Sequence, residues 1–239
     1  MKAVILTGGK GTRLAPYTTV LPKPLLPIGK IPILEIILRQ LKHYGFSEVV
    51  LACGYLSELI QAYLMTNKIS KHLKINYHRE EHPLGTAGAL ATIEGLDETF
   101  LVMNGDILTT LDYSKLVQFH KEKKAALTIA ITQKKVQIEL GVLHMNDKNQ
   151  ITGYEEKPVK IFPSSTGIYI YEPRVLNYIT KNTYLDFPTL VIRLIEAGEI
   201  VAGYPIDAFW LDMGNKDDYE RAVIEFERNI SAFHIANGS

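Results

Sequence analysis

The sequence predicts an α/β fold with a mainly parallel sheet and an antiparallel extension in its second half. In the first half, short apolar runs alternate with segments of helical periodicity, which is typical of parallel strands joined by crossover helices. After residue 125 several strand-like segments follow one another with little helix between them. The chain has 239 residues, 46% hydrophobic and 22% charged, which is enough to bury the core of a single domain.

Residues 2–7 are an apolar run that predicts a buried first strand, and the glycine-rich loop 8–14 follows it. Its three glycines allow a sharp turn that brings backbone N–H groups against a phosphate, and Arg13 adds a cationic fork. A tight turn without a ligand explains the glycines equally well. A dinucleotide fingerprint needs glycine where Leu14 stands and a helix at once, which the following prolines oppose.

Four prolines are expected to hold the next segment extended, and Lys23 lies between two of them. Because proline limits the backbone on both sides, this lysine is predicted to be presented to a ligand. The prolines are Pro16, Pro22, Pro24 and Pro27.

The rest of the first half predicts alternating helices and strands. Residues 32–44 carry apolar side chains three and four apart, begin with proline and end before Gly45, as a helix does. Ser57 is a candidate helix cap. Helices are expected over 32–44, 56–65, 85–94 and 111–123, and strands over 48–53, 74–78 and 99–103.

The second half predicts an antiparallel extension that covers the mouth of the first half. Strands are expected over 126–132, 141–145, 151–155, 165–171, 200–204 and 209–211, and helices over 188–198 and 216–228. Residues 229–239 are small and polar at their end and are expected to fray.

The charge and cysteine content exclude several classes of protein. Acidic and basic residues number 26 each, so no overall field attracts nucleic acid or an anionic membrane. Phosphate binding must come from local groups such as Lys10, Arg13 and Lys23. Cys53 is the only cysteine, which excludes an internal disulfide and favours a buried, inert thiol in a reducing compartment. Without a signal peptide or a spanning apolar stretch, the protein is expected in the cytoplasm.

The glycine-rich loop, followed by Pro22-Lys23-Pro24 and Leu26-Pro27, resembles the signature of the sugar-1-phosphate nucleotidyltransferases, or nucleotide-sugar pyrophosphorylases. The resemblance implies a Rossmann-like three-layer nucleotidyltransferase fold in one domain, residues 1–239. Residues 1–124 would bind the nucleotide, residues 125–228 would form the antiparallel sugar-phosphate-binding extension, and 229–239 would be a tail. The chain stops short of the C-terminal β-helix domain common in the family, so a second activity is not expected.

Two aspartates are candidate magnesium ligands. Asp106 follows the strand 99–103, at the end where parallel sheets bind ligands, although a capping Asx turn is an alternative. Asp212 alone would more often cap the helix that starts near Lys216. The resemblance implies that both hold Mg²⁺, which proteins bind with few ligands and which phosphate oxygens and water complete.

The motif Glu155-Glu156-Lys157-Pro158 resembles the sugar-phosphate contact of the family. The resemblance implies that Lys157 holds the phosphate and Glu156 a sugar hydroxyl. It also places Gly141, Thr166 and Gly167 against the sugar. A solvated turn and ordinary strand glycines at a bulge are the alternatives.

Residues 84–88 resemble the loop that lies against the nucleobase, and Glu80 falls where the family reads the base edge. A carboxylate only accepts hydrogen bonds, and guanine offers two adjacent donors, so GTP is the expected nucleotide. The resemblance is strongest to mannose-1-phosphate guanylyltransferases. Glu81 is the alternative in another register. His78 and His82 lack cysteine partners at zinc spacing.

The implied reaction joins NTP and a sugar 1-phosphate to give NDP-sugar and pyrophosphate. UTP, dTTP or CTP, a non-sugar phosphate such as phosphocholine, and a non-catalytic regulator remain alternatives. Mg²⁺ is the implied cofactor, neither nucleic acid nor membrane is an expected partner, and a homodimer or homotetramer is typical of the family. The candidate catalytic residues are Arg13, Lys23, Asp106 and Asp212, and the candidate nucleotide-binding residues are Leu6, Gly8, Gly9, Gly11, Thr12, Arg13, Lys23, Glu80, Gly85 and Thr86.

Overall fold

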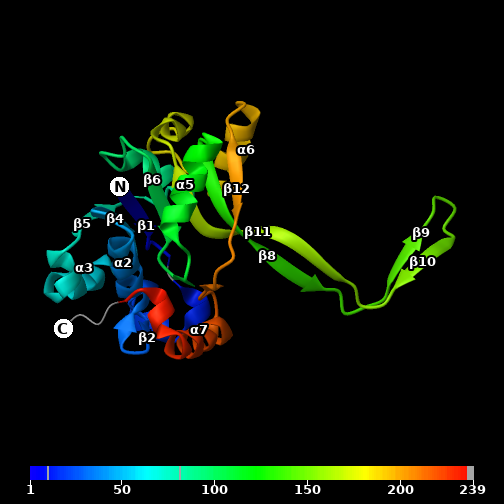
Figure 1. Ribbon diagram of the computed structural model, residues 1–239, viewed down its shortest axis with the longest axis horizontal. Coiled ribbons are helices and arrows are strands. Elements are labelled where there is room, and N and C mark those ends of the chain that lie inside the picture. Colours follow the sequence, from blue (N-terminus) through cyan, green and yellow to red (C-terminus); the bar gives the residue numbers. More distant parts are fainter. Residues whose placement is uncertain (10, 81, 236–239) are drawn as a thin grey trace.

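A seven-stranded sheet lies at the centre of the molecule, with helices on both faces and a long arm leaving one side (Figure 1). The computed structural model describes residues 1–9, 11–80 and 82–235. In spatial order the strands are β12 (Val201–Pro205), β8 (Leu127–Gln137), β11 (Val159–Tyr171), β6 (Phe100–Asn104), β1 (Lys2–Leu6), β4 (Glu48–Cys53) and β5 (Lys74–Arg79).

The sheet is mixed, as the sequence predicts. Strand β1 is parallel to both β4 and β6, and β4 is parallel to β5. Strand β11 is antiparallel to β6 and to β8, and β12 runs parallel to β8. Later strands of the chain are added on both sides of β1. This reversal of strand order leaves a crevice at the carboxyl ends of β1 and its neighbours.

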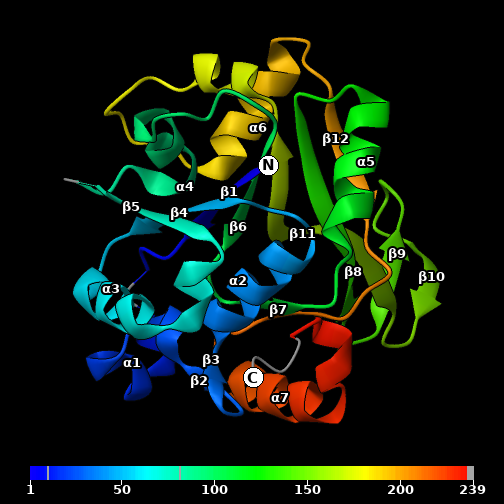
Figure 2. The same ribbon diagram turned by 60° about the vertical axis from the view of Figure 1, so that its left-hand side comes forward.

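Alternating side chains of each strand feed two apolar clusters, one on each face of the sheet. Ala3 and Ile5 of β1 join the first cluster and Val4 the second. The helices α2 (Ile33–His43), α3 (Ser57–Thr66), α5 (Tyr113–Lys123) and α7 (Lys216–Arg228) pack on the first, and α4 (Gly85–Gly88) and α6 (Phe187–Glu196) on the second. Figure 2 shows this three-layer arrangement, which confirms the predicted fold class.

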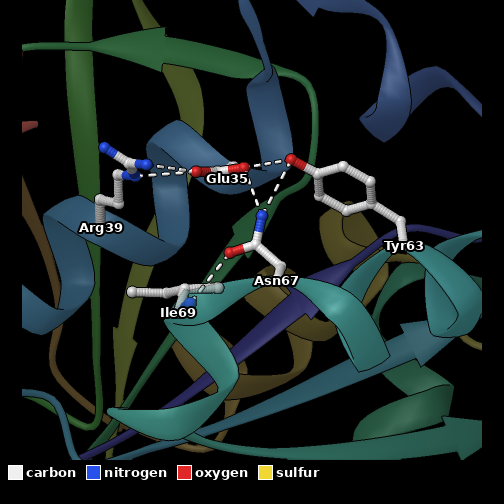
Figure 3. Close-up of polar contacts among 5 residues, drawn as sticks. All are labelled: Glu35, Arg39, Tyr63, Asn67 and Ile69. Atoms are coloured by element: carbon white, nitrogen blue, oxygen red, sulfur yellow. Dashed lines mark hydrogen bonds and ion pairs between the residues drawn. The ribbon is translucent and has the colours of Figure 1, made fainter. Parts of the chain in front are cut away.

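A buried carboxylate ties the helical layer together on the α2 side (Figure 3). Glu35 of α2 is only 3% exposed and accepts hydrogen bonds from Arg39, Tyr63 and Asn67. Asn67 in turn accepts a hydrogen bond from the Ile69 N–H, which starts the 3-10 turn Lys68–Lys71. Burial and the Glu35 carboxylate raise the pKa of Tyr63. This cluster joins α2 to α3 and has a structural role.

Several local predictions are wrong for identifiable reasons. The proline segment is not extended: it forms the turns Thr12–Leu14 and Lys23–Leu25 and the one-turn helix α1 (Tyr17–Val20). Pro24 lies in the first turn of Lys23–Leu25, where a missing N–H costs nothing, and Pro16 and Pro22 are the N-caps of α1 and of that turn. Pro27 alone lies in a short strand, Pro27–Ile28. Ser57 is the first residue of α3 and not its cap, because Leu56 occupies that position with a left-handed backbone.

Two longer elements also differ from their prediction. The segment 85–94 divides into α4 and the 3-10 turn Ala89–Thr92. The tail forms a further turn, Ile230–Phe233, because Phe233 is buried in the core and holds it there. Residues 236–239 lie outside the described part. The remaining 3-10 turn is Pro173–Tyr178, and the short strands are β2 (Pro27–Ile28), β3 (Ile31–Pro32), β7 (Ile107–Thr109), β9 (Val142–Met145), β10 (Ile151–Glu155) and β13 (Trp210–Asp212).

The antiparallel extension projects away from the sheet and does not cover its mouth (Figure 1). Strands β8 and β11 stay paired from Ile131–Ser165 out to Gln137–Val159, and the hairpin β9–β10 continues beyond them. Because the two strands pair with each other along this length, their direction is set by the ribbon and not by packing on the body. We call residues 133–164 the arm and the rest of the chain the body.

No helix in the described part of the chain combines the length and the apolar character that are needed to cross a bilayer.

Candidate active site

Three parallel strands of the body end at the same level. Leu6 at the end of β1 pairs with Ala52 of β4 on one side and with Asn104 of β6 on the other. The loops beyond are joined by backbone hydrogen bonds from the Thr7 N–H to the Ala52 carbonyl and from the Gly105 N–H to the Leu6 carbonyl, both 2.9 Å. Strand register therefore assembles the loops at one edge of the sheet.

A cavity of about 340 Å³ opens at this edge, and we call it the crevice. Six of its lining residues are predicted nucleotide contacts, and Asp106 is a predicted catalytic residue. Asp106 also borders a smaller cavity next to Lys23. The crevice is lined by Leu6, Gly8, Gly9, Ala52, Glu80, Pro83, Gly85, Thr86, Asn104 and Asp106.

Glycines shape the loop after β1. Gly11 has φ +62°, and a Cβ there would lie 2.9 Å from Cγ2 of Thr18, whose hydroxyl donates a 2.7 Å hydrogen bond to the Gly11 carbonyl. Gly54, which the sequence analysis missed, follows β4. A Cβ at Gly54 would lie 2.9 Å from the carbonyl oxygen of Gly8, so only glycine lets the two loops touch. A glycine directly after a strand adjacent to β1 is the signal that identifies it.

The two aspartates are brought together by a short pair of strands. Asp212 on β13 pairs with Ile107 on β7, and the Met213 N–H donates a 3.1 Å hydrogen bond to the Asp106 carbonyl. Asp212 does not cap α7, because Asn215 does so through its side chain. The capping alternative for Asp212 is therefore excluded.

Two cations lie next to these carboxylates. The Lys23 ammonium contacts Oδ2 of Asp106 closely and lies 3.9 Å from Oδ1 of Asp212. Arg13 lies beside Gly214, with guanidinium nitrogens 3.6 Å from where a Cβ would stand. Burial and then the Asp106 charge raise the pKa of Asp212, against the opposing effect of Lys23 and Arg13. All four predicted catalytic residues thus share one site.

The carboxylates fit a magnesium ion. Oδ1 of Asp106 and Oδ1 of Asp212 are buried, and neither has a hydrogen-bond partner among the described residues. Such buried acceptors require a donor or a cation. Within the described residues no cluster of three or more His, Cys, Asp or Glu side chains could form a closed metal site. Two carboxylates that leave positions for phosphate and water match the usual coordination of Mg²⁺.

Two predicted sugar contacts border the crevice at a bulge in β11. The Trp210 indole donates a 2.9 Å hydrogen bond to the Thr166 carbonyl, and the buried Thr166 hydroxyl donates to the Ala130 carbonyl at 2.8 Å. Gly167 has φ +76°, and a Cβ there would come within 2.6 Å of Nδ2 of Asn104. The Thr166 hydroxyl proton is therefore used inside the fold, while Gly167 permits close packing beside the crevice.

The other predicted sugar contacts are on the arm, away from the crevice. Gly141 packs against the ring and hydroxyl of Tyr154, which donates a 2.7 Å hydrogen bond to Glu156. Glu156 and Lys157 are exposed, and Lys157 has φ +45°. The structure therefore does not bring these three residues together with the catalytic four.

The base-reading candidate lies in the crevice. Oε2 of Glu80 accepts a 2.8 Å hydrogen bond from the Leu84 N–H, which fixes the loop that leads to Gly85. No hydrogen bond joins its second oxygen to a described residue, so one acceptor is left for a ligand. Glu81 and Lys10 lie outside the described residues. His78 is hydrogen-bonded to the Thr92 hydroxyl at 2.8 Å.

Cys53 lies at the end of β4, 1% exposed. Burial raises the pKa of its thiol, which keeps it protonated and unreactive at neutral pH. The predicted burial of Cys53 is confirmed.

Comparisons with known proteins show which family this chain resembles. The sequence pattern described as nucleotidyl transferase matches residues 2–229. A UTP–glucose-1-phosphate uridylyltransferase of Synechocystis is 36% identical over 93% of this chain, and a probable mannose-1-phosphate guanylyltransferase of Oryza sativa is 35% identical over 100% of it. The chain spans 62% and 69%, respectively, of the length of these two relatives.

A solved structure shares the fold. The crystal structure of HddC from Yersinia pseudotuberculosis, complexed with GMP-PN, is 25% identical with a TM-score of 0.72, over 94% of this chain and 99% of that one. The family pattern matches nearly the whole chain, over residues 2–229. The chain also covers 69% of the Oryza sativa relative at 35% identity, and both findings assign the chain to one family. This chain belongs to the nucleotidyl transferase family.

Proposed function

We propose that the protein transfers a nucleotidyl group from NTP to a sugar 1-phosphate and releases pyrophosphate. The observation that carries this proposal is the pair Asp106 and Asp212 next to Lys23, at the edge of a glycine-lined crevice. Each aspartate has a buried oxygen without a hydrogen-bond partner among the described residues. A carboxylate pair with an adjacent ammonium suits phosphoryl chemistry, in which positioning and charge neutralisation dominate.

In the proposed reaction an oxygen of the sugar phosphate attacks the α-phosphorus in line. A new P–O bond forms as the bond to the pyrophosphate oxygen breaks, and pyrophosphate leaves with both electrons of that bond. The glycine-rich loop holds the nucleotide, and Arg13 receives the β- and γ-phosphates. Lys23 neutralises charge at the α-phosphate, in exchange for its present contact with Asp106. Asp106 and Asp212 would hold Mg²⁺, which neutralises phosphate charge when it is bound.

The proposed acceptor is mannose 1-phosphate or a related hexose or heptose 1-phosphate. Within the proposal Lys157 binds its phosphate, Glu156 and Gly141 contact the sugar, and Thr166 and Gly167 shape the inner wall of the site. The motif resemblance supports these roles.

We propose GTP as the preferred nucleotide, with Glu80 as the reason. Glu80 shares the crevice with Gly85 and Thr86 and keeps one carboxylate oxygen without a described partner. Guanine presents two neighbouring donors on its Watson–Crick edge, whereas uracil and thymine present one donor between two acceptors. The names of the two curated relatives divide between guanylyl and uridylyl transfer, so the base is a specific point to test.

A pyrophosphate-release assay tests both levels of the proposal. It would compare GTP, UTP, dTTP, CTP and ATP, each with a panel of hexose and heptose 1-phosphates, in wild type and Glu80→Gln. We expect GTP to be favoured by about ten- to hundredfold and the preference to fall in the variant. Glu227→Gln, exposed on α7, is the matched control. Preference for UTP or dTTP, or an unchanged preference in Glu80→Gln, would contradict the base assignment. No release with any pair would overturn the reaction.

A further inference from the structure

The arm exposes more apolar surface than an isolated ribbon in water should. Leu140, Met145, Ile151, Tyr154 and Ile161 are 74%, 61%, 62%, 61% and 55% exposed. A two-stranded ribbon without a third layer is marginally stable on its own. Five large apolar side chains exposed on one ribbon exceed the scattered exposure that is normal on a protein surface, which points to an interaction site. The arm therefore requires a surface to pack on.

The arm also carries part of the proposed active site. This step rests on the proposed function, in which Glu156 and Lys157 bind the sugar phosphate. Both side chains are exposed, and Lys157 has no ion pair or hydrogen bond to any described residue. The crevice of the same chain lacks them, although Thr166 at the root of the arm is anchored beside it by Trp210.

The reach of the ribbon keeps Lys157 away from its own crevice. Residues from Val159 to Ser165 are paired in continuous register with β8, so this stretch is fully extended. Thr166 and Val159 are seven positions apart along this strand, which at the rise of a β-strand is roughly 23 Å. A lysine side chain cannot span that length, and the ribbon points away from the body (Figure 1).

An uncovered apolar rim lies beside the crevice of the body. Tyr17, Val20, Leu21 and Tyr55 are 44%, 69%, 38% and 37% exposed. The Tyr55 hydroxyl joins the two parts of this rim through a 3.3 Å hydrogen bond to the Thr19 carbonyl. The rim lies next to the glycine-rich loop, because Thr18 is hydrogen-bonded to the Gly11 carbonyl and Gly54, next to Tyr55, abuts Gly8. The chain's own arm points elsewhere (Figure 1), so this rim is open to another molecule.

We propose that two copies of this chain exchange arms, and that each arm packs on the rim of the partner subunit and delivers Glu156 and Lys157 to its crevice. A second copy supplies both an apolar arm for the open rim and the missing motif for the incomplete site. A two-fold arrangement satisfies both sites at once and leaves no arm unpaired. The active unit is then a dimer with two shared sites.

Light scattering tests the pairing without reference to activity. Wild type should have the mass of a dimer. A variant in which a two-residue turn replaces residues 139–157 should be a monomer, and the 3.0 Å hydrogen bond between the Ile138 N–H and the Pro158 carbonyl shows that these ends already meet. The double substitution Leu140→Asp and Ile151→Asp should also give a monomer, with Met65→Asp, 83% exposed on α3, as the control that stays a dimer. A monomeric wild type would overturn the proposal.

Mixing two impaired variants tests the shared site, with the sugar 1-phosphate held far below its KM. Asp106→Asn impairs the body half and Lys157→Ala the arm half, so each homodimer should retain about a tenth of the wild-type rate or less. After exchange, half of the dimers are mixed and each has one intact site, so about a quarter of the wild-type rate should return. No recovery, in a mixture shown to have exchanged subunits, would mean that the arm acts on its own chain. A wild type that releases no pyrophosphate would overturn the proposed reaction. The masses of wild type and arm variants from light scattering would still test the arm exchange in that case.

Discussion

The crevice and the arm contain parts of the same sequence signature in opposite structural settings. In the crevice, Asp212 reaches Asp106 because β13 pairs with β7, and Lys23 lies against both carboxylates. On the arm, Lys157 is exposed and its neighbours are held only by the hairpin. Packing and register thus fix the geometry of the body within one chain. The arm has fixed local structure, and its working geometry depends on the surface that it meets.

The largest expected effect comes from a substitution in the crevice of the body. Asp106→Asn removes a charge that holds both Lys23 and the proposed metal, so turnover should fall by about 100-fold or more, with the fold intact. Pyrophosphate release would measure the turnover, and far-UV circular dichroism would show whether the fold is intact. Asp207→Asn, exposed in the loop before β13, is the control. Near-normal Mg²⁺-dependent turnover in Asp106→Asn would remove this carboxylate from the chemistry.

A second pair of variants separates the two regions by their kinetic effect. Lys23→Ala should lower kcat by about 10- to 100-fold, because its ammonium neutralises charge that develops at the α-phosphate. Lys157→Ala should instead raise KM for the sugar 1-phosphate by about tenfold, because it holds that phosphate in the ground state. Steady-state kinetics with each substrate varied would distinguish them.

Lys148→Ala, exposed at the tip of the arm, controls for a general loss of positive charge there. An unchanged sugar-phosphate KM in Lys157→Ala would separate the arm from the active site. An unchanged kcat in Lys23→Ala would show that its contact with Asp106 is only structural.

The sequence predicted the body well because its signals are local or depend on strand order. Apolar runs identified β1 and β4, and amphipathic periodicity identified α7. The rule that ligands bind at the carboxyl ends of parallel strands placed Asp106. The direction of the arm was not predictable in this way. Alternating residues in 126–171 specify strands, but no local pattern specifies whether a paired ribbon folds back or projects.

Gly54 was not predicted as a site residue for a related reason. Its role depends on a contact with Gly8, a residue 46 positions earlier, which appears only once β1 and β4 are neighbours. The proline segment was mispredicted because prolines favour both extended chain and the first turn of a helix. Which form wins depends on packing beneath it, where Leu14 and Leu25 are buried.

Gly54→Ala tests whether the register between β1 and β4 fixes the loops at the crevice. The new methyl group would collide with the backbone of Gly8, so the phosphate loop must shift, and overpacking of this kind costs about 1–3 kcal/mol. We expect a lower melting temperature and about tenfold weaker nucleotide binding by calorimetry. Gly203→Ala on β12 is the matched control, because its methyl group would meet only the flexible Ile131 side chain at 3.3 Å. Equal effects in the two variants would contradict a specific contact between the loops.

The smallest expected effect concerns the free energy of unfolding and its dependence on pH. Burial and the Asp106 charge raise the pKa of Asp212 in the folded protein. For a raised pKa, the contribution to stability is complete below the unfolded pKa and is lost as the pH rises through the folded pKa. Asp212→Asn cannot ionise and avoids this loss. Without Mg²⁺ it should therefore melt about 1–3 °C higher at pH 7.5, by a margin that shrinks as the pH falls, although it loses turnover. Glu139→Gln, an exposed acid on the arm, should show no such trend in thermal melts from pH 4 to 8. A wild type that melts at or above Asp212→Asn at pH 7.5 would contradict the view that the crevice holds its carboxylates at a cost in stability until a cation binds.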